Sequence, residues 1–404
     1  MAADPDARQR TAKPRVLIVG PVAPVGGMAQ FIRLVTTHEE SCEWHTHSTY
    51  RGEKTEKRGK GVGYGQLTSG GLGRLLASGA KTIGKILIYP WVVLAKRTQV
   101  CYLTFAPYLV FWEMVFYTIW SRLLFRPILA HQLGPLDQFY EASPGWVRWI
   151  IRRTVLVADG HLVLTHGVAN MLRSWGCKAP IDVVPSAVDV DHYCPGEGHR
   201  EEGHEPFLLF MGGARPRRKG IDLVVEAFTR IAERFPDLRL KLSGGDEIYP
   251  FEQPLSEAGL AGRADLVGFV DEDEKLEYMR TCHLFLLPSR MECVPYAIIE
   301  AMACGAPVVG SDIGGIPETI VENETGRIVP NEDVDALADA MEAILADDEL
   351  RARMARQARE RAVAEYSLDA AMAKVGAMTR YVFRPSEEGP GQSSSASGRQ
   401  SPSS

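Results

Sequence analysis

The sequence lacks the residue patterns that mark several classes of protein. Its seven cysteines are scattered, with no Cys-x-x-Cys pair and no Cys/His cluster at zinc spacing, so we expect free thiols and no bound metal or other cofactor. The net charge of -6 gives no global attraction to nucleic acid, and we expect none as a partner. No signal peptide is recognisable in the first residues, which predicts a cytoplasmic protein.

Long hydrophobic runs are also absent. The most hydrophobic segment, residues 100–125, is interrupted by Pro107 and Glu113. A membrane-spanning helix needs ~20 apolar residues without such breaks. A buried strand followed by a buried helix therefore explains this segment better than a membrane span.

The patterns that are present predict an α/β protein. Short apolar runs alternate with helical patterns along most of the 404 residues, and this length is sufficient for two domains, each with its own core. Residues 1–13 and 385–404 are polar and have no apolar periodicity, so we expect both terminal tails to be disordered.

The clearest pattern lies in residues 284–319. Leu284–Leu287 is typical of a buried parallel strand, and Pro295 suits the first turn of a helix, where its missing N–H costs nothing. Glu292 lies in the loop before this helix, and Glu300 follows eight residues later, inside the second turn. One carboxylate is thus expected at the carboxyl end of a strand and the other on the helix beside it.

This position suits a ligand that carries both hydroxyls and phosphate. Ligands of open α/β sheets bind in the crevice at the carboxyl ends of the strands. A helix N-terminus there favours phosphate, whereas a carboxylate is a good acceptor for the hydroxyls of a diol. Two glutamates at this spacing are by themselves common on solvated helices, so the surrounding sequence must carry the interpretation.

The surrounding sequence resembles a known family. The two glutamates, followed by Ala-Met-Ala-Cys-Gly-x-Pro-Val-Val and Gly-Gly-Ile-Pro-Glu, resemble the retaining nucleotide-sugar glycosyltransferases of family 4, the glycosyl transferases group 1. The resemblance covers about residues 14–383. It implies the GT-B fold, with two Rossmann-like domains across a cleft: an acceptor domain over 14–194, a donor domain over 195–367, and a helix over 368–384 that crosses back.

The resemblance also assigns roles around the two glutamates. It implies that Glu292 holds hydroxyls of the donor sugar and that Glu300 holds the ribose hydroxyls of the nucleotide. The neighbouring donor-binding residues would be Val294, Pro295 and Tyr296. The family usually has Ser or Gly, Phe, Gly after the first acid, and this chain has Cys-Val-Pro, which we interpret as the mark of a subgroup.

A basic turn follows the first strand expected in the second domain. Breaking a glycosyl–diphosphate bond leaves negative charge on the leaving group, and fixed cations can stabilise that charge without a metal. Lys219 matches the diphosphate lysine of the family. The family arginine usually follows the glycine, here the predicted donor-binding residue Gly213, but Ala214 occupies that place. The catalytic role therefore falls to Arg215, with Arg218 as the alternative.

Four further positions are expected at the donor. Gly26 and Gly27 lie between the first strand and the following helix, where glycine lets the backbone approach a ligand closely. Gly244 follows the end of a strand, and Val270 ends the segment that in the family meets the nucleotide base. Because that contact is made largely by backbone, the identity of the base cannot be predicted from these residues.

The first domain adds two polar residues. His131, at a strand end, matches a family histidine beside the donor sugar, although a lone histidine there is usually a structural hydrogen bonder. The predicted catalytic residues are therefore Glu292, Lys219, Arg215 and His131. Asp137 is expected to contact the acceptor. Asp189 and Asp191 match an Asp-x-Asp metal pattern, but Asp is a common turn former at a domain boundary, so we expect no metal dependence.

The resemblance implies transfer of a hexose-type sugar from a nucleoside diphosphate sugar to a sugar or lipid-linked acceptor, in polysaccharide or glycolipid assembly. Relatives with lipid-linked acceptors commonly dock on membranes through the first domain. The aromatic helix expected over 108–126 and the basic loop 51–73 leave membrane association open, beside core packing and a solvated loop. Two other functions stay open: a non-catalytic nucleotide-sugar-binding protein, which Ala214 favours, and a sugar-nucleotide epimerase or phosphorylase on the same fold.

Overall fold

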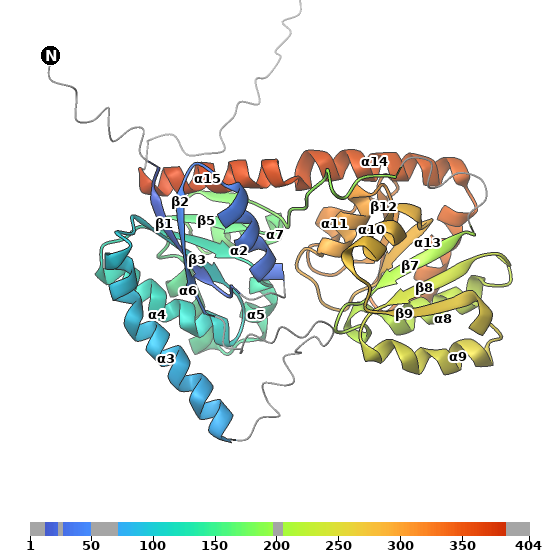
Figure 1. Ribbon diagram of the computed structural model, residues 1–404, viewed down its shortest axis with the longest axis horizontal. Coiled ribbons are helices and arrows are strands. Elements are labelled where there is room, and N and C mark those ends of the chain that lie inside the picture. Colours follow the sequence, from blue (N-terminus) through green and yellow to red (C-terminus); the bar gives the residue numbers. More distant parts are fainter. Residues whose placement is uncertain (1–12, 23–26, 50–71, 197–204, 385–404) are drawn as a thin grey trace, which may run out of the picture.

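The structure is a computed structural model that describes residues 13–22, 27–49, 72–196 and 205–384, with the backbone alone for 72–78. Both terminal tails, most of the basic loop 51–73, and Gly26 lie outside the described residues. The described chain forms two six-stranded parallel sheets that are covered by helices (Figure 1). The predicted α/β class is confirmed.

The first sheet has the strand order β2-β1-β3-β4-β5-β6, and all its strands are parallel. Its strands are β1 (Arg15–Gly20), β2 (Glu43–Ser48), β3 (Val100–Phe105), β4 (Ile128–Gln132), β5 (Gly160–Val163) and β6 (Ile181–Val183). The central strands are buried because helices cover both faces, which explains their continuous apolar runs.

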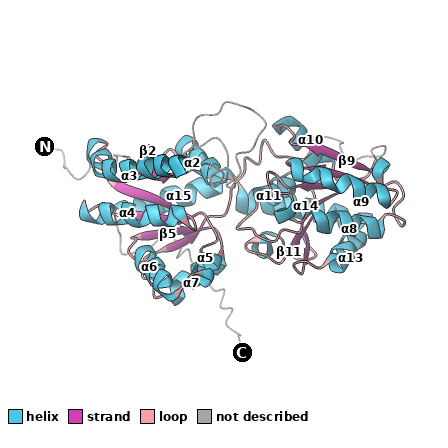
Figure 2. Ribbon diagram, turned by 90° about the horizontal axis from the view of Figure 1, so that it is seen from below, coloured by secondary structure: helices cyan, strands magenta, loops and turns pink. Residues whose placement is uncertain are grey.

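Two layers of helices enclose this sheet. On one face, α2 (Gly27–His38) and α15 (Leu368–Phe383) share a core with the inward side chains of β1 and β3. On the other face lie α3 (Leu72–Ala95), α4 (Leu109–Leu123), α6 (Gly145–Val155) and α7 (His166–Ser174), with the short α5 (Leu136–Ala142) between α4 and α6 in sequence. Figure 2 shows the strands of each half surrounded by helices.

The second sheet has the order β12-β11-β10-β7-β8-β9 and is also parallel throughout. Its strands are β7 (Phe207–Met211), β8 (Arg239–Ser243), β9 (Ala264–Gly268), β10 (Leu284–Leu287), β11 (Val308–Ser311) and β12 (Gly326–Val329). Its helices are α8 (Ile221–Ile231), α9 (Glu252–Glu257), α10 (Glu272–Thr281), α11 (Tyr296–Ala303), α12 (Ile316–Thr319), α13 (Val334–Leu345) and α14 (Asp348–Tyr366). One continuous hydrophobic core joins these elements.

The end of the chain connects the two halves. Met354 and Ala358 of α14 are buried in the core of the second half, whereas Val375 of α15 is buried in the first. Between the helices, Ser367 caps α15 by accepting a hydrogen bond from the Ala370 N–H (3.4 Å) and pairs with Val188. Figure 1 shows α14 and α15 running along the same side of both halves.

Several predicted bounds were wrong. Apolar residues over 81–95 indicate a helix, and the structure begins this helix already at Leu72. The helix predicted over 108–126 spans only Leu109–Leu123 because Phe125 adopts a positive φ of 53°. Helix α13 begins at Val334, because the Asp333 carboxylate accepts a hydrogen bond from the Ala336 N–H at 2.9 Å and so caps the helix.

Two differences concern the site. Pro295 is the N-cap residue of α11 instead of a residue of its first turn. The segment predicted as a strand up to Val270 ends at Gly268, so Val270 lies in the loop between β9 and α10. The edge strand β2 was missed, because its sequence Glu-Trp-His-Thr-His-Ser has no run of apolar residues.

Candidate functional site

The second sheet reverses its strand order between β7 and β10. These two strands are hydrogen-bonded neighbours, so their carboxyl ends and the loops that follow lie side by side. The loop after β7 carries the basic turn, and the loop after β10 carries Glu292. In open α/β sheets such a reversal is the usual ligand crevice. Residues more than 70 positions apart in sequence, such as Lys219 and Glu292, therefore meet at one point.

Lys219 and Glu292 form an ion pair at the centre of this crevice. Their side chains are 19% and 10% exposed, so the pair is largely shielded from water. Burial, and then the nearby charge of Arg218, lower the pKa of Lys219 to about 7, while the carboxylate of Glu292 favours the charged form. An anion bound beside Lys219 would add a second favourable partner for its charge.

Positive charge is concentrated in this turn. Arg215 lies close enough to Arg218 that its charge, after burial, lowers the pKa of Arg218. The Nε of Arg218 is buried and has no hydrogen-bond partner among the described residues. A buried guanidinium N–H without an acceptor is costly unless a ligand supplies one. The cluster of Arg215, Arg218 and Lys219 therefore suits a diphosphate.

The backbone of Glu292 is held by a glycine turn from the next loop. Gly314 has a φ of 60°, and a Cβ at this residue would lie 1.9 Å from the carbonyl oxygen of Glu292. The adjacent Gly315 donates its N–H to the carbonyl oxygen of Cys293 at 2.5 Å. Only glycine permits this approach, so the Gly-Gly-Ile-Pro-Glu motif supports the loop that carries Glu292.

Arg290 joins the two crevice loops and was missed in the sequence. Its guanidinium donates to both carboxylate oxygens of Asp222 (2.8 and 2.7 Å) and to both of Glu332 (2.6 and 2.8 Å). It also donates to the carbonyl oxygen of Arg217 at 2.6 Å. The loop after β10 is thereby tied to α8 and to the basic turn. A single arginine in a loop gave no signal of this role, because its partners are distant in sequence.

Glu300 occupies a buried polar network at the side of the crevice. Its carboxylate lies 3.4 Å from the Nζ of Lys275, which also pairs with Glu272 at 3.1 Å. Burial raises the pKa of Glu300 above its ordinary value, and Lys275 opposes this shift. The hydroxyl of Tyr193 donates to Glu272, and its ring lies 4.8 Å from the Nζ of Lys275. The segment between the two halves therefore borders this carboxylate.

The first half faces this crevice at three points. A Cβ on Gly27 would lie 3.3 Å from the Cε2 of Tyr296 in α11. The hydroxyl of Ser186 donates to the carbonyl oxygen of Val294 at 3.0 Å. Burial, and then the charge of Asp137, raise the pKa of the Cys293 thiol to about 12, which places Asp137 near the loop that carries Glu292.

His131 is placed differently from the other predicted catalytic residues. It is fully buried in the core of the first half, with its Nδ1 2.6 Å from the hydroxyl of Tyr102 and its ring edge against Phe31. Burial lowers the pKa of His131 to about 3, so the ring is neutral. Its Nε2 has no hydrogen-bond partner within the described part of the chain. No surface of His131 is exposed to a sugar in this arrangement.

The remaining predicted donor residues lie at the ends of β7, β8 and β9. The N–H of Gly245 donates to the carbonyl oxygen of Gly213 at 2.8 Å, and that of Gly244 donates to Gly268 at 2.9 Å. Beside them, the side chains of Tyr249 and Phe269 are 50% and 51% exposed. Phe269 directly follows β9, in the segment expected to meet the nucleotide base, whereas Tyr249 lies in the short 3-10 helix Asp246–Phe251 and was missed. Val270 follows Phe269 in the same loop.

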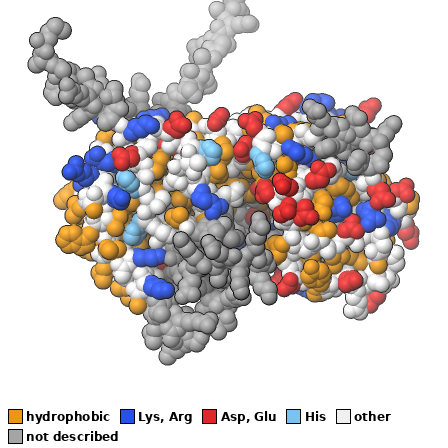
Figure 3. Space-filling model, viewed as in Figure 1, with side chains coloured by type: hydrophobic (Ala, Val, Ile, Leu, Met, Phe, Trp, Pro, Cys, Tyr) orange, Lys and Arg blue, Asp and Glu red, His pale blue; other side chains and the backbone are white. Residues whose placement is uncertain are grey.

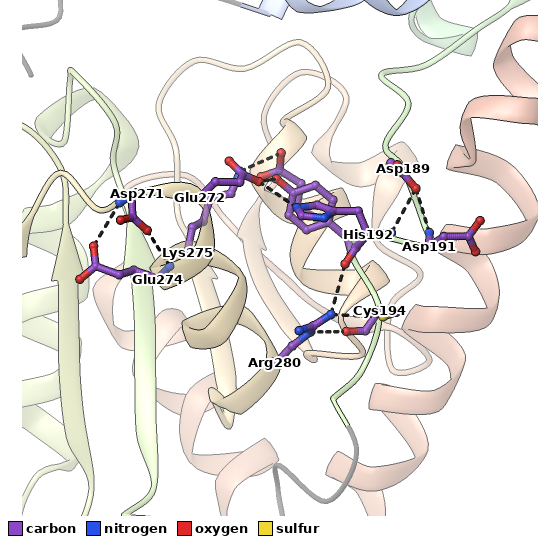
Figure 4. Close-up of polar contacts among 11 residues, drawn as sticks. Asp189, Asp191, His192, Cys194, Asp271, Glu272, Glu274, Lys275 and Arg280 are labelled. Atoms are coloured by element: carbon purple, nitrogen blue, oxygen red, sulfur yellow. Dashed lines mark hydrogen bonds and ion pairs between the residues drawn. The ribbon is translucent and has the colours of Figure 1, made fainter. Parts of the chain in front are cut away.

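The described residues contain no group of three His, Cys, Asp or Glu side chains that could hold a metal. The carboxylate of Asp189 accepts hydrogen bonds from the N–H groups of Asp191 and His192 at 3.0 and 3.1 Å (Figure 4). The Asp-x-Asp segment thus forms a local turn, as its position at a domain boundary predicted.

Known proteins resemble the chain in sequence. A model of the family described as glycosyl transferases group 1 matches residues 197–361. The phosphatidyl-myo-inositol mannosyltransferase of Mycolicibacterium smegmatis is 32% identical over 203 residues, which cover 48% of this chain and 51% of the relative. The GDP-mannose-dependent alpha-(1-6)-phosphatidylinositol monomannoside mannosyltransferase of Mycobacterium tuberculosis is 30% identical over 277 residues, which cover 63% of this chain and 71% of the relative. The matched part spans about half the length of the first relative.

Solved structures share the fold. A sucrose-phosphate synthase from Thermosynechococcus elongatus has a TM-score of 0.70 at 22% identity, with 93% of this chain and 100% of that chain covered. HepE of Anabaena, solved in complex with UDP, has a TM-score of 0.68 at 16% identity, with 90% and 98% covered. At such identities the likeness concerns the arrangement of the two sheets and their helices.

Proposed function

The chain belongs to the glycosyl transferases group 1 family and has its two-domain GT-B fold, and on this premise we propose that it transfers a hexose-type sugar from a nucleoside diphosphate sugar to an acceptor. The observation that carries the proposal is the meeting of Lys219 and Glu292 at the strand-order reversal of the second sheet. A phosphate ligand of Lys219 and a hydroxyl ligand of Glu292 would be parts of one molecule.

The donor would lie along the carboxyl ends of the second sheet. Its diphosphate would contact Lys219, Arg218 and Arg215, whose mutual repulsion a bound anion relieves. Its sugar hydroxyls would contact Glu292. Its ribose would contact Glu300, which must then exchange its ion pair with Lys275 for hydroxyl donors. Gly213, Gly244 and Val270 would be the remaining residues of the second half that contact the donor.

We propose that the reaction needs no metal and retains the anomeric configuration. The basic turn would supply the charge compensation that a divalent cation gives in other transferases, and each such contact can lower the barrier by a few kcal/mol. The leaving phosphate would itself help to remove the proton of the acceptor hydroxyl, so no side chain is named as the base. GDP-mannose is the donor named for the Mycobacterium tuberculosis relative and is the first donor to test.

The acceptor is proposed to be a glycolipid or a lipid-linked sugar, held by the first half near Asp137. The two curated relatives named above act on phosphatidylinositol lipids, as their names state. Asp137 lies near Cys293, beside the predicted sugar ligand Glu292, and so borders the place where the acceptor hydroxyl must arrive. Membrane association would bring the protein to such an acceptor.

A thermal-shift screen tests the donor part of this proposal. GDP, UDP, ADP and their hexose conjugates are added without metal, and one nucleotide is expected to raise the melting temperature selectively. The shift should be lost in Lys219→Ala and kept in the matched control Lys241→Ala, which removes a lysine that pairs with Asp265 at 3.1 Å on the same sheet. Equal shifts in both variants would remove Lys219 from the diphosphate site.

A further inference from the structure

Lys275 lies between two carboxylates that differ strongly in exposure. Its Nζ is 3.4 Å from Glu300, whose side chain is 7% exposed, and 3.1 Å from Glu272, whose side chain is 54% exposed. One ammonium group therefore bridges a buried carboxylate and a solvated one. A buried carboxylate needs a cation or hydrogen-bond donors to stay charged, whereas water stabilises an exposed one. The two carboxylates thus depend on Lys275 to different degrees.

Titratable groups from three elements face Glu300. They are Lys275 and Glu272 of α10, Tyr193 of the segment between the halves, and Tyr296 of its own helix. Burial raises the pKa of Glu300; the charge of Lys275 opposes this shift, and the charge of Glu272 adds to it. Of these groups, Lys275 favours the ionised form of Glu300 most strongly.

Glu272 is held by the segment between the two halves. The hydroxyl of Tyr193 donates to its carboxylate, and the Nε2 of His192 lies 3.5 Å from it (Figure 4). Burial opposes the ionisation of Glu272, but the hydrogen bond from Tyr193 and then the charge of Lys275 outweigh it and lower the pKa of Glu272. The ring of Tyr193, 4.8 Å from the Nζ of Lys275, also favours a cation at this point. Glu272 is therefore a charged partner that can keep Lys275 without Glu300.

The first turn of α10 carries negative charge. It contains Glu272, Asp273 and Glu274. Figure 3 shows Asp and Glu side chains gathered over the part of the second half where Figure 1 places α10. An ammonium group that leaves Glu300 for Glu272 therefore stays beside negative charge and gains contact with water.

The backbone around Tyr193 is anchored to the second half. Arg359 of α14 donates to the carbonyl oxygens of Tyr193 at 2.8 Å and of Ala303, the last residue of α11, at 3.0 Å. Arg280 of α10 donates to the carbonyl oxygen of Cys194 at 2.8 Å. Helices α10, α11 and α14 and this segment are thereby held together. The ammonium group of the lysine can change partners by a side-chain rotation alone.

Helix α10 begins beside the place expected for the nucleotide. Only the loop 269–271 separates β9 from α10. In this loop, Val270 is expected at the base, and Phe269 is 51% exposed. A ribose is joined directly to the base, so it would lie between this loop and Glu300. Its hydroxyls are donors that can take the place of the ammonium group at the buried carboxylate.

We propose that Lys275 is a positioning residue of the nucleotide site: its ammonium group holds Glu300 charged in the donor-free protein and passes to Glu272 when the ribose hydroxyls bind. The inference rests on the proposed function, because it takes the ribose as the ligand of Glu300. It adds the residue that prepares Glu300 and the residue that receives the displaced cation. Because Glu300 is already ionised, it accepts both hydroxyls without first losing a proton.

Urea unfolding of the full chain without nucleotide tests the first half of the proposal. Lys275→Met should lower the urea midpoint more at about pH 8 than at about pH 5, because Glu300 takes up a proton at the lower pH and then needs no cation. In the Glu300→Gln background the same substitution should have little effect at either pH.

Lys241→Met is the matched control for Lys275→Met. The side chain of Lys241 is 22% exposed, that of Lys275 is 20% exposed, and each lies 3.1 Å from a carboxylate. Lys241 also lies 5.2 Å from an aromatic ring, that of Phe207. Its replacement should lower the urea midpoint equally with and without Glu300→Gln.

Calorimetric titration with the nucleoside diphosphate that the melting screen selects tests the exchange. At about pH 6, Lys275→Met should bind it roughly tenfold more weakly than wild type and release a proton that wild type does not release. Buffers of different ionisation enthalpy detect this proton, and Lys275→Arg should bind without releasing it. Glu272→Gln removes the receiving carboxylate and should weaken binding with little change in the urea midpoint. Asp273→Asn, which is exposed in the same turn of α10, should bind like wild type.

Three results would overturn the proposal. They are weaker binding of Lys275→Met without proton release, a loss of stability in that variant that persists in the Glu300→Gln background, and wild-type affinity in Glu272→Gln. If Lys275→Met folds only in the Glu300→Gln background, the dependence of Glu300 on this cation is confirmed. A wild-type protein that binds no nucleoside diphosphate would refute the proposed function and with it the exchange, whereas the coupling of Lys275 to Glu300 is measured without nucleotide.

Discussion

The carboxylate of Glu318, in the second half, accepts hydrogen bonds from the backbone N–H groups of His166 (2.6 Å) and Gly167 (2.9 Å) at the start of α7 in the first half. A negative charge at this position satisfies free N–H groups and complements the helix dipole. Glu318 follows Gly314 and Gly315, which support the backbone of Glu292 and Cys293. A single motif thus links the contact between the halves to the loop that carries Glu292.

Replacing Glu318 should loosen this link. Glu318→Ala is expected to destabilise the chain by about 1 kcal/mol, as for the loss of a helix cap, and to raise the KM for the donor more than it lowers kcat. Hydrogen exchange at the amides of His166 and Gly167 should become faster. Glu324→Ala, an exposed glutamate in the turn after α12, is the control. Unchanged exchange at His166 and Gly167 would show that the carboxylate does not cap α7 in solution.

Arg290→Met should separate the two crevice loops. The substitution leaves Asp222 without its bidentate partner and is expected to cost about 2 kcal/mol of unfolding free energy, together with weaker nucleotide binding. Arg234→Met, which breaks an ion pair of a 67% exposed arginine with Glu342, should cost much less. Urea titration of both variants gives the comparison, and equal costs would mean that Arg290 has no special structural role.

The ribose assignment of Glu300 predicts a selective effect. Wild-type affinity should fall for nucleoside diphosphates that lack a ribose hydroxyl, because the buried carboxylate loses a donor. Glu300→Gln should weaken binding of the normal nucleotide but reduce this discrimination. Calorimetric titration of both proteins with the 2′-deoxy and 3′-deoxy nucleotides measures it. Discrimination that is unchanged in Glu300→Gln would place the ribose elsewhere.

The lowered pKa of Lys219 predicts a pH dependence of binding. In the donor-free protein this pKa is about 7, and a bound diphosphate raises it by favouring the charged form. Affinity should therefore be constant below about pH 7 and fall above it, by up to tenfold per pH unit, because binding then takes up a proton. Calorimetry in buffers of different ionisation enthalpy detects this proton. Lys219→Arg should remove the dependence, and its persistence in that variant would assign it to another group.

Three buried histidines predict acid sensitivity. Burial lowers the pKa of His131 to about 3 and those of His47 and His161 to about 4. Histidine in the unfolded chain has a pKa of about 6.5, so below that pH the unfolded chain binds more protons than the folded protein. The free energy of unfolding therefore decreases as the pH falls from about 6.5 towards 4. Neither ring nitrogen of His161 has a partner in the described residues. Between pH 6.5 and 4, the His161→Leu variant should take up one proton fewer on unfolding than the wild type, so its free energy of unfolding should depend less steeply on pH. An unchanged dependence would contradict the burial argument.

The sequence was most informative where the site is local. The strand, loop and helix that place Glu292 and Glu300 are contiguous, so apolar runs and a proline were sufficient to predict their arrangement. The basic turn was equally accessible, because glycine and cations follow a strand directly. The parallel α/β class followed from the same local patterns.

Other features depend on residues that are distant in sequence. Arg290 meets Asp222 across 68 positions, and Glu318 meets His166 across 152, and no local pattern records such pairs. The burial of His131 depends on Phe31 and Tyr102 from other elements. The outward exposure of α3 could not be predicted either, since its residues satisfy the pattern of a core helix on both sides.

The most direct test of the central claim is consumption of a nucleoside diphosphate hexose by the wild-type protein and by Glu292→Ala, with the nucleotide that the melting screen selects. We expect the wild type to release the nucleoside diphosphate without added metal. Glu292→Ala should lower kcat/KM at least tenfold, whereas the control Glu342→Ala, which removes the partner of the exposed Arg234, should keep wild-type rates. Tight nucleotide binding without turnover, or equal rates in wild type and Glu292→Ala, would contradict the proposed transfer.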